Sequence, residues 1–189
     1  MGVKCIIEPT VEPVSVSDIK PHAKVDIDGD DALIARYIKA ARKHAENLTE
    51  RALAPATYRL SLDAFPDGGI QIPRPPVTAI VSIQYIDSAG VLQTIDSADY
   101  ALDDDQEPAW VLPAYGYTWP STRDVANAVR VIFQAGYTAE QCPAPIAHYI
   151  EVVVAAMYAQ REILAQADRV PKSVQFYDGL LDVYRVWGV

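Results

Sequence analysis

The clearest pattern in the chain is an apolar stripe within residues 30–53 that repeats at helical spacing. The stripe consists of Leu33, Ile34, Tyr37, Ile38, Ala41, Ala45 and Leu48. Residues three and four positions apart share one face of a helix, and that face needs a surface to pack against. The charged residues fall on the other face, which we expect to lie in water: Arg36, Lys39, Arg42, Lys43, Glu46, Glu50 and Arg51. Pro55 is expected to end this helix.

A second stripe of the same kind predicts another long helix over residues 144–167. Pro143 and Pro145 favour its first turn because their fixed φ suits the start of a helix. Its apolar face is formed by Ile146, Tyr149, Ile150, Val153, Val154, Met157 and Leu164. The two helices have similar lengths and apolar faces of similar width, so we expect them to pack against each other.

Between these helices the period changes from helical to alternating. Short alternating runs bounded by turn residues predict strands at 58–63, 70–72, 77–87, 91–95, 100–102, 109–112 and 128–134. Turn sequences such as Pro66-Asp67-Gly68-Gly69 and Ser88-Ala89-Gly90 favour antiparallel hairpins. Before the first long helix, Ser15 to Lys20 offers caps for one short helix, whose length Pro21 is expected to limit.

These patterns predict an α+β fold in a single domain, residues 1–189. We expect a helical core of two long helices, formed by residues 1–55 and 143–189. An antiparallel β unit, residues 56–137, is inserted between the two parts of this core. A C-terminal helical segment completes the chain. This length suits one domain and can bury a sizeable core.

The C-terminal segment after Pro171 carries a third apolar stripe that is rich in aromatic residues. It consists of Phe176, Tyr177, Leu180, Leu181, Tyr184 and Trp187. Pro171 suggests that the segment is hinged from the preceding helix, and its stripe is too apolar to remain in water. We expect it to lie in a groove, either on the same subunit or on a partner.

A second concentration of aromatic residues follows the predicted strand at 109–112. Trp110, Tyr115, Tyr117 and Trp119 lie within a short stretch that prolines stiffen. Such residues are common in protein–protein interfaces, but they also cover cores. They are therefore expected either to cap the β unit of their own subunit or to contact another protein.

Composition and motifs exclude several classes of function. The net charge of −9, from 16 basic and 25 acidic residues, argues against a protein that neutralises DNA phosphates, although not against one that DNA slides past. The histidines His22, His44 and His148 accompany no nucleophile, zinc or phosphate-loop motif, so we expect no enzyme. No apolar run is long enough to span a membrane.

Metal and disulfide sites are also not expected. Residues 26–31 resemble the start of a calcium loop, but the glycine comes fourth instead of sixth and Tyr37 stands at the twelfth position. We interpret this stretch as a turn with acidic capping of the long helix. Cys5 and Cys142 lie in no CxxC pair and are expected to be reduced thiols. The sequence therefore indicates no cofactor, no metal and no nucleic-acid site.

Taken together and in order, several blocks resemble the head–tail connector proteins of tailed bacteriophages, also called head-completion adaptors. The blocks are residues 13–53, IPRPPVTAIVSIQYID at 72–87, YALDD at 100–104, AVRVIFQAGY at 128–137, PAPI at 143–146, VVVAAMYAQRE at 152–162 and LLDVYRVW at 180–187. Each block is a common string, and their order and spacing carry the resemblance. Glu50 is a departure, since the family usually has glycine there.

The resemblance implies a non-enzymatic structural protein of the virion neck, made in the cytoplasm of a bacterial host. Such proteins form a closed ring of about 12 copies beneath the portal protein, complete the DNA-filled head and receive the tail or stopper proteins. DNA would pass through the ring without specific binding, which suits an acidic protein, and no membrane is involved. The alternatives are another neck component, such as a tail terminator or stopper, and a generic protein-interaction module. The resemblance extends to related gene-transfer particles.

Overall fold

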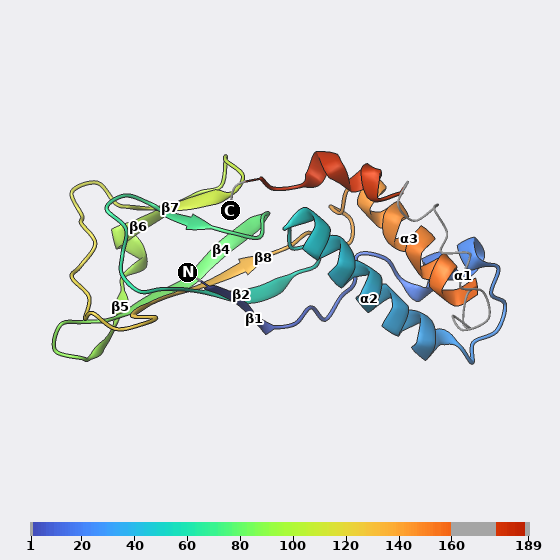
Figure 1. Ribbon diagram of the computed structural model, residues 1–189, viewed down its shortest axis with the longest axis horizontal. Coiled ribbons are helices and arrows are strands. Elements are labelled where there is room, and N and C mark those ends of the chain that lie inside the picture. Colours follow the sequence, from blue (N-terminus) through green and yellow to red (C-terminus); the bar gives the residue numbers. More distant parts are fainter. Residues whose placement is uncertain (1, 160–176, 188–189) are drawn as a thin grey trace, which may run out of the picture. The chain divides into compact units, whose positions relative to one another are not determined.

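The chain is an α+β protein that divides into two compact units. A computed structural model describes residues 2–159 and 177–187 (Figure 1). The first unit, here called the strand unit, contains the residues up to Thr10, Pro55–Gly136 and the end of the chain from Val186. The second, the helical unit, contains Val11–Ala54 and Tyr137–Arg185.

The elements follow the predicted order closely. The helices are α1 (Val16–Ala23), α2 (Asp31–Thr49) and α3 (Ala144–Ala159), with short 3-10 helices η1 (Ser97–Asp99) and η3 (Gly179–Tyr184). The strands are β1 (Gly2–Ile7), β2 (Ala56–Leu62), β3 (Ile70–Ile72), β4 (Val77–Ile86), β5 (Leu92–Ile95), β6 (Tyr100–Asp103), β7 (Ala109–Pro113) and β8 (Val129–Ala135). The part of the second predicted long helix beyond residue 159 lies outside the described residues.

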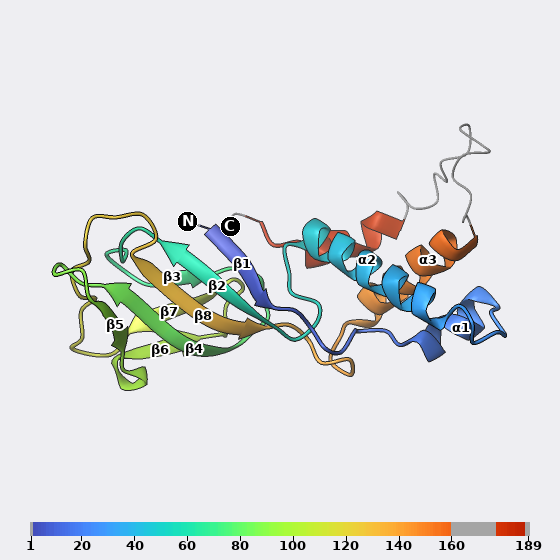
Figure 2. The same ribbon diagram turned by 90° about the horizontal axis from the view of Figure 1, so that it is seen from below.

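The strand unit consists of two antiparallel sheets. Five strands pair in the order β1-β2-β8-β4-β5 and three in the order β3-β7-β6; Figure 2 shows the smaller sheet behind the larger one. Burial alternates along β8, where Val129, Val131 and Phe133 are buried while the residues between them are partly exposed. This alternation places one face of the large sheet in the core and leaves the other toward solvent.

Strand β1 is absent from the sequence-based predictions. It pairs antiparallel with β2, so that Val3 lies opposite Leu60 and Cys5 opposite Tyr58. Its residues Val3, Cys5, Ile6 and Ile7 do not alternate with polar residues. β1 is an edge strand, and both of its faces are largely exposed. An edge strand of this kind carries no period-two signal.

The helical unit is built on the predicted stripes of α2 and α3. Buried residues from α1, α2, α3 and η3 form one apolar cluster that includes Ile19, Ile34, Ile38, Ala41, Ala45, Ile146, Tyr149, Ile150, Val153, Val154 and Leu181. The predicted pairing of the two long helices is therefore present within this unit. Met157, which the stripe placed on the apolar face, is 36% exposed.

The boundaries of both N-terminal helices differ from the prediction. Helix α2 ends at Thr49 rather than at Leu53, because Glu50 adopts the left-handed conformation at φ 56°. This conformation terminates a helix and is usually occupied by glycine. Helix α1 continues through Pro21 to Ala23, and a capping box between Ser15 and Asp18 secures its first turn.

Candidate functional site

The aromatic stretch after β7 is partly folded onto its own strand unit. The Trp119 ring stacks on Phe65, with ring centroids 5.0 Å apart and an angle of 6° between the planes. Its Nε1–H donates a hydrogen bond to the Gly68 carbonyl at 2.7 Å. Tyr117 meets Trp119 edge-on at 6.3 Å, and burial together with Asp99 raises the pKa of the Tyr117 hydroxyl.

These rings form the wall of an open depression of about 440 Å³ in the strand unit. Its lining also includes prolines, among them Pro66, Pro113 and Pro120. Asp67 is the one ionisable side chain in this lining besides Tyr117. A depression built from aromatic rings and prolines can accept an apolar side chain, but it lacks a converging set of acids, bases or nucleophiles.

The other two aromatic residues of this stretch lie apart from that contact. Trp110 is half-buried on β7, opposite Gln71 on one side and Asp103 on the other. Tyr115 is fully exposed, next to Gly116, which adopts a positive φ of 81°. Of the four predicted interface residues, Tyr115 is thus the one whose whole ring is accessible.

The C-terminal segment lies against the helical unit of its own subunit. Leu181 is fully buried in the apolar cluster, and Tyr177 and Tyr184 pack against that cluster. The Tyr149 hydroxyl donates to the Asp178 carboxylate at 2.9 Å, and Arg51 Nε donates to the Tyr184 carbonyl at 2.5 Å. The groove expected from the sequence is therefore on the same subunit for this part of the segment.

Not every residue of the predicted stripe is enclosed. Trp187 is 77% exposed, whereas Leu180 is half-buried. Val183, which the predicted stripe did not include, is 83% exposed. Phe176, the first residue of the predicted stripe, lies outside the described residues. Because residues 179–184 form a 3-10 helix, their side chains follow a three-residue period, so the α-helical spacing did not identify the exposed face.

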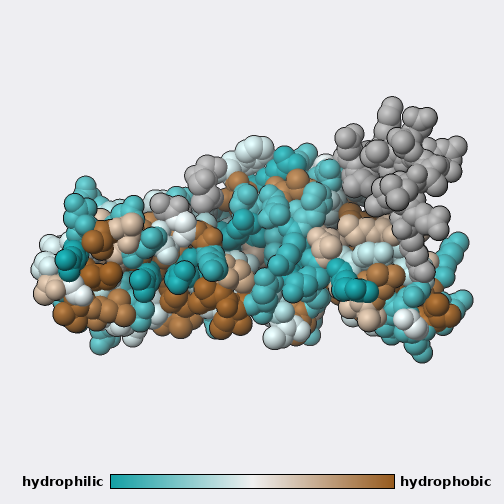
Figure 3. All heavy atoms as spheres, turned by 60° about the horizontal axis from the view of Figure 1, so that its bottom comes forward, coloured by the Kyte–Doolittle hydropathy of each residue, from teal (hydrophilic) through white to brown (hydrophobic). Residues whose placement is uncertain are grey.

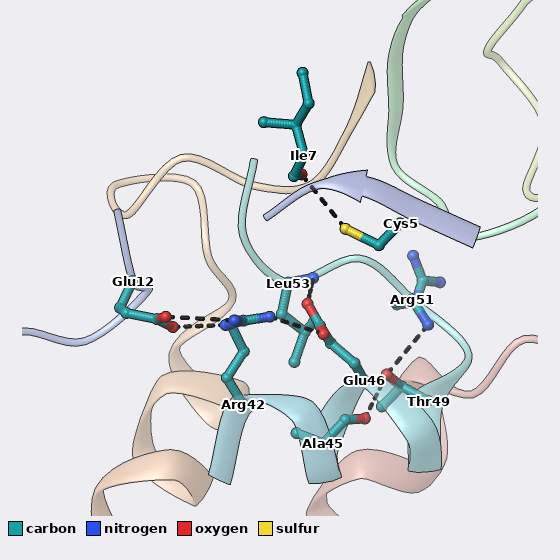
Figure 4. A network of polar contacts seen from close by, with 9 residues as sticks. All are labelled: Cys5, Ile7, Glu12, Arg42, Ala45, Glu46, Thr49, Arg51 and Leu53. Atoms are coloured by element: carbon teal, nitrogen blue, oxygen red, sulfur yellow. Dashed lines mark hydrogen bonds and ion pairs between the residues drawn. The ribbon is translucent and has the colours of Figure 1, made fainter. Parts of the chain in front are cut away.

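A buried ion-pair network fixes the N-terminal lead-in to α2 (Figure 4). The Arg42 guanidinium binds Glu12 through Nε at 2.6 Å and Glu46 through Nη1 at 2.9 Å. Glu46 also accepts a hydrogen bond from the Leu53 backbone N–H at 3.1 Å. Burial alone lowers the pKa of Arg42, but the bonds to the two carboxylates raise it on balance.

The prediction that Arg42, Glu46 and Arg51 lie in water is wrong, since their residues are 1%, 9% and 8% exposed. Arg42 and Glu46 pair with each other and Arg51 binds a carbonyl group, and these bonds offset part of the cost of burying the charges. Helical periodicity assigns every charged residue to the solvent face. The signal that could have identified this network is the spacing of Arg42 and Glu46, four residues apart, which brings them together on one face.

The acidic linker before α2 is engaged by a lysine. Lys20 Nζ lies 2.5 Å from Asp28 and 2.7 Å from Asp31, and its bond to Asp28 lowers the pKa of that carboxylate. Asp30 occupies the N-cap position without a side-chain capping bond, and its carboxylate accepts a hydrogen bond from the Tyr158 hydroxyl at 2.7 Å instead. Within residues 2–159 and 177–187, no group of His, Cys, Asp or Glu side chains is placed to hold a metal ion.

The cysteines are not paired with each other. Cys5 and Cys142 are partly buried and form no disulfide, and burial raises the pKa of the Cys142 thiol to about 11. In the part of the chain that the structure describes, no helix is both long and apolar enough to cross a membrane.

Solved structures share this fold over the full chain. A chain in the virion of a native gene transfer agent (GTA) particle is 22% identical, with a TM-score of 0.79, and the match covers 100% of this chain and 97% of that one. A chain in the neck of an empty GTA particle with C6 symmetry is 23% identical, with a TM-score of 0.79 and the same coverage. Another, in the neck of a native GTA particle with C12 symmetry, is 23% identical, with a TM-score of 0.76 and again the same coverage.

The sequence itself matches one protein family. Residues 13–101 match the family of phage gp6-like head-tail connector proteins. No curated protein matches the chain. The resemblance to head-tail connector proteins seen in the sequence is thereby confirmed over residues 13–101.

Proposed function

We propose that this protein is a structural, non-enzymatic component of the neck of a phage or gene-transfer particle, where it connects head and tail. The observation that carries the proposal is the family match over residues 13–101. The fold that the whole chain shares with chains of GTA particles supports it independently. Manufacture in the cytoplasm of a bacterial host follows from this role.

The protein works as a ring of identical copies that lies below the portal and receives the tail or stopper proteins. The neck structures that share its fold have C6 and C12 symmetry, which supports a ring of several copies. The net charge of −9 suits a channel component, since acidic groups repel phosphates and leave DNA free to pass.

The partner contacts use the exposed apolar residues at the two predicted surfaces. Tyr115 after β7, and Val183 and Trp187 at the chain's end, supply accessible apolar area that a partner can cover. Trp110, Tyr117 and Trp119 are partly buried within the same strand unit. Tyr177, Leu181 and Tyr184 hold the 3-10 helix η3 on the helical unit, and Val183 of this helix is exposed.

Deletion of the gene, followed by complementation, tests this function. Without the protein, we expect particles to accumulate as separate heads and tails in electron micrographs, and the intact gene should restore joined particles. Complementation with Trp187→Ala should join fewer particles than complementation with Arg36→Ala, a matched change at an exposed residue of α2. Normal particle yield from the deletion strain would contradict the proposal.

A further inference from the structure

The outer face of the five-stranded sheet collects basic residues. Lys4 on β1 lies directly opposite Arg59 on β2, and Arg59 lies opposite Ile132 on β8. Arg130 follows two residues from Ile132, on the same face. Buried neighbours on either side of Arg59 and of Arg130 fix this face as the outward one. Figure 3, which views this face obliquely, shows hydrophobic and hydrophilic residues side by side over the strand unit.

No acidic residue offsets these charges within the sheet. The residues that pair in the five-stranded sheet include no Asp or Glu. Among the residues that the structure describes, Lys4, Arg59 and Arg130 form no ion pair or side-chain hydrogen bond. Asp63, just beyond β2, binds the Asn127 backbone N–H at 2.8 Å. Like charges placed directly opposite each other on a sheet are destabilising, so this face is suited to an anionic partner.

The same face also carries apolar area. Ile132, Ile86 and Leu92 share it by register, and Leu92 is 51% exposed. Arginine is enriched at protein interfaces relative to the rest of the surface. The face therefore has both the charge and the apolar area of a docking surface.

The strand unit carries the complementary charge elsewhere. The turn between β6 and β7 contains Asp103, Asp104, Asp105 and Glu107. Asp104 and Asp105 are exposed and take part in no ion pair among the described residues. This turn belongs to the three-stranded sheet, whereas the basic face belongs to the five-stranded one.

We propose that the basic face formed by Lys4, Arg59 and Arg130 binds the acidic turn, residues 103–107, of another copy of this chain. A basic face cannot bind itself, because its charges repel, so the contact joins two different surfaces of the subunit. Repeated head to tail, such a contact gives a ring where the rotation between neighbouring copies closes. The inference rests on the proposed function only for the closure of that ring.

DNA is a poorer occupant for the same face. Neutralising phosphates with about three cations gives weak, salt-sensitive binding. The remainder of the chain, with a net charge of −9, repels a polyanion at longer range. An acidic turn of a second copy brings a small local charge and leaves the rest of that subunit free to make apolar contacts.

Charge reversal tests the contact by sedimentation velocity of the full-length protein at low and high salt. The wild type should self-associate, more strongly at low salt. Arg59→Glu with Arg130→Glu should weaken association about tenfold or more, and so should Asp104→Lys with Asp105→Lys. Exposed charges outside both surfaces provide matched controls, Arg36→Glu and Asp124→Lys, which should leave association unchanged. Circular dichroism and the melting temperature check that each variant is folded.

An equimolar mixture of the two reversed variants gives the decisive result. The face that now carries glutamates, on one variant, can bind the turn that carries lysines on the other. The native basic face of the second variant can bind the native acidic turn of the first. Association should therefore return. A wild type that stays monomeric at low salt, a reversal without effect, or a mixture that fails to associate would each overturn the inference. The inference would also be overturned if the Arg59/Arg130 variant lost the ability to retain duplex DNA while its self-association stayed unchanged. The proposed function is tested separately, on particles, and it fails if the particles lack this chain.

Discussion

The charge on Arg42 is the residue-level feature on which the helical unit depends most. Its guanidinium is nearly inaccessible and joins the lead-in residue Glu12 to Glu46 on α2. Removing this cation is costly because Glu46, which is largely buried, loses its ion pair with Arg42. Arg42 therefore contributes to stability through its bonds and not through solvation of the helix surface.

We expect Arg42→Ala to lower the free energy of unfolding by about 3–5 kcal/mol. Arg36→Ala, on the exposed face of the same helix, should change it by no more than about 0.5 kcal/mol. Urea denaturation followed by circular dichroism measures both. Equal effects of the two substitutions would show that the network does not stabilise the unit.

Glu50 makes a second, independent test at the residue scale. It holds φ at 56° at the end of α2, where a side chain beyond hydrogen is strained. Glu50→Ala and Glu50→Gly remove the same side-chain contacts, but only glycine relieves the strain. We expect the glycine variant to be about 1 kcal/mol more stable than the alanine variant, a difference of about 2–4 °C in melting temperature. An alanine variant as stable as the glycine variant would refute the strain.

Among the elements, η3 joins the end of the chain to the helical unit. Leu181 lies in the cluster with α2 and α3, while Val183, two residues later, is 83% exposed. The segment therefore has one side that folds the subunit and another that is available to a partner. The sequence suggested a hinged segment, yet its central leucine belongs to the core.

We expect Leu181→Ala to destabilise the protein by about 2–5 kcal/mol, as the loss of a buried leucine side chain does. Val183→Ala should change stability by no more than about 0.5 kcal/mol. Thermal melts of both variants provide the measurement. If Leu181→Ala melts like the wild type, the packing of η3 on the helical unit is not part of the stable fold.

Periodicity predicted the elements with a buried face well. Strands β3, β7 and β8 and helices α2 and α3 carry alternating or helical stripes because one face of each is buried. Strand β1 has no such contrast, and the end of α2 depends on one backbone angle at Glu50. At the candidate surfaces, composition identified the aromatic residues but did not separate Trp119, which stacks on Phe65, from Tyr115, which is exposed. That separation depends on contacts between distant parts of the chain.

For the whole molecule, the path of the chain bears on how the two units unfold. The chain passes between them at residues 10–11, 54–55, 136–137 and 185–186. Each unit is thus assembled from separate segments of the sequence, which are connected through the other unit. Neither unit can therefore form fully before the other has formed. We expect one cooperative unfolding transition, as a single domain gives. Differential scanning calorimetry should show one peak, with equal calorimetric and van't Hoff enthalpies. Two resolved peaks would mean two independent domains.

The central claim is that this chain connects head to tail. Image reconstruction of purified particles tests it most directly, because the fold described here can be fitted into the density and identified by its side chains. We predict a ring of copies of this chain in the neck, between the portal and the tail. Density for the chain elsewhere in the particle, or particles that join head and tail without it, would contradict that claim.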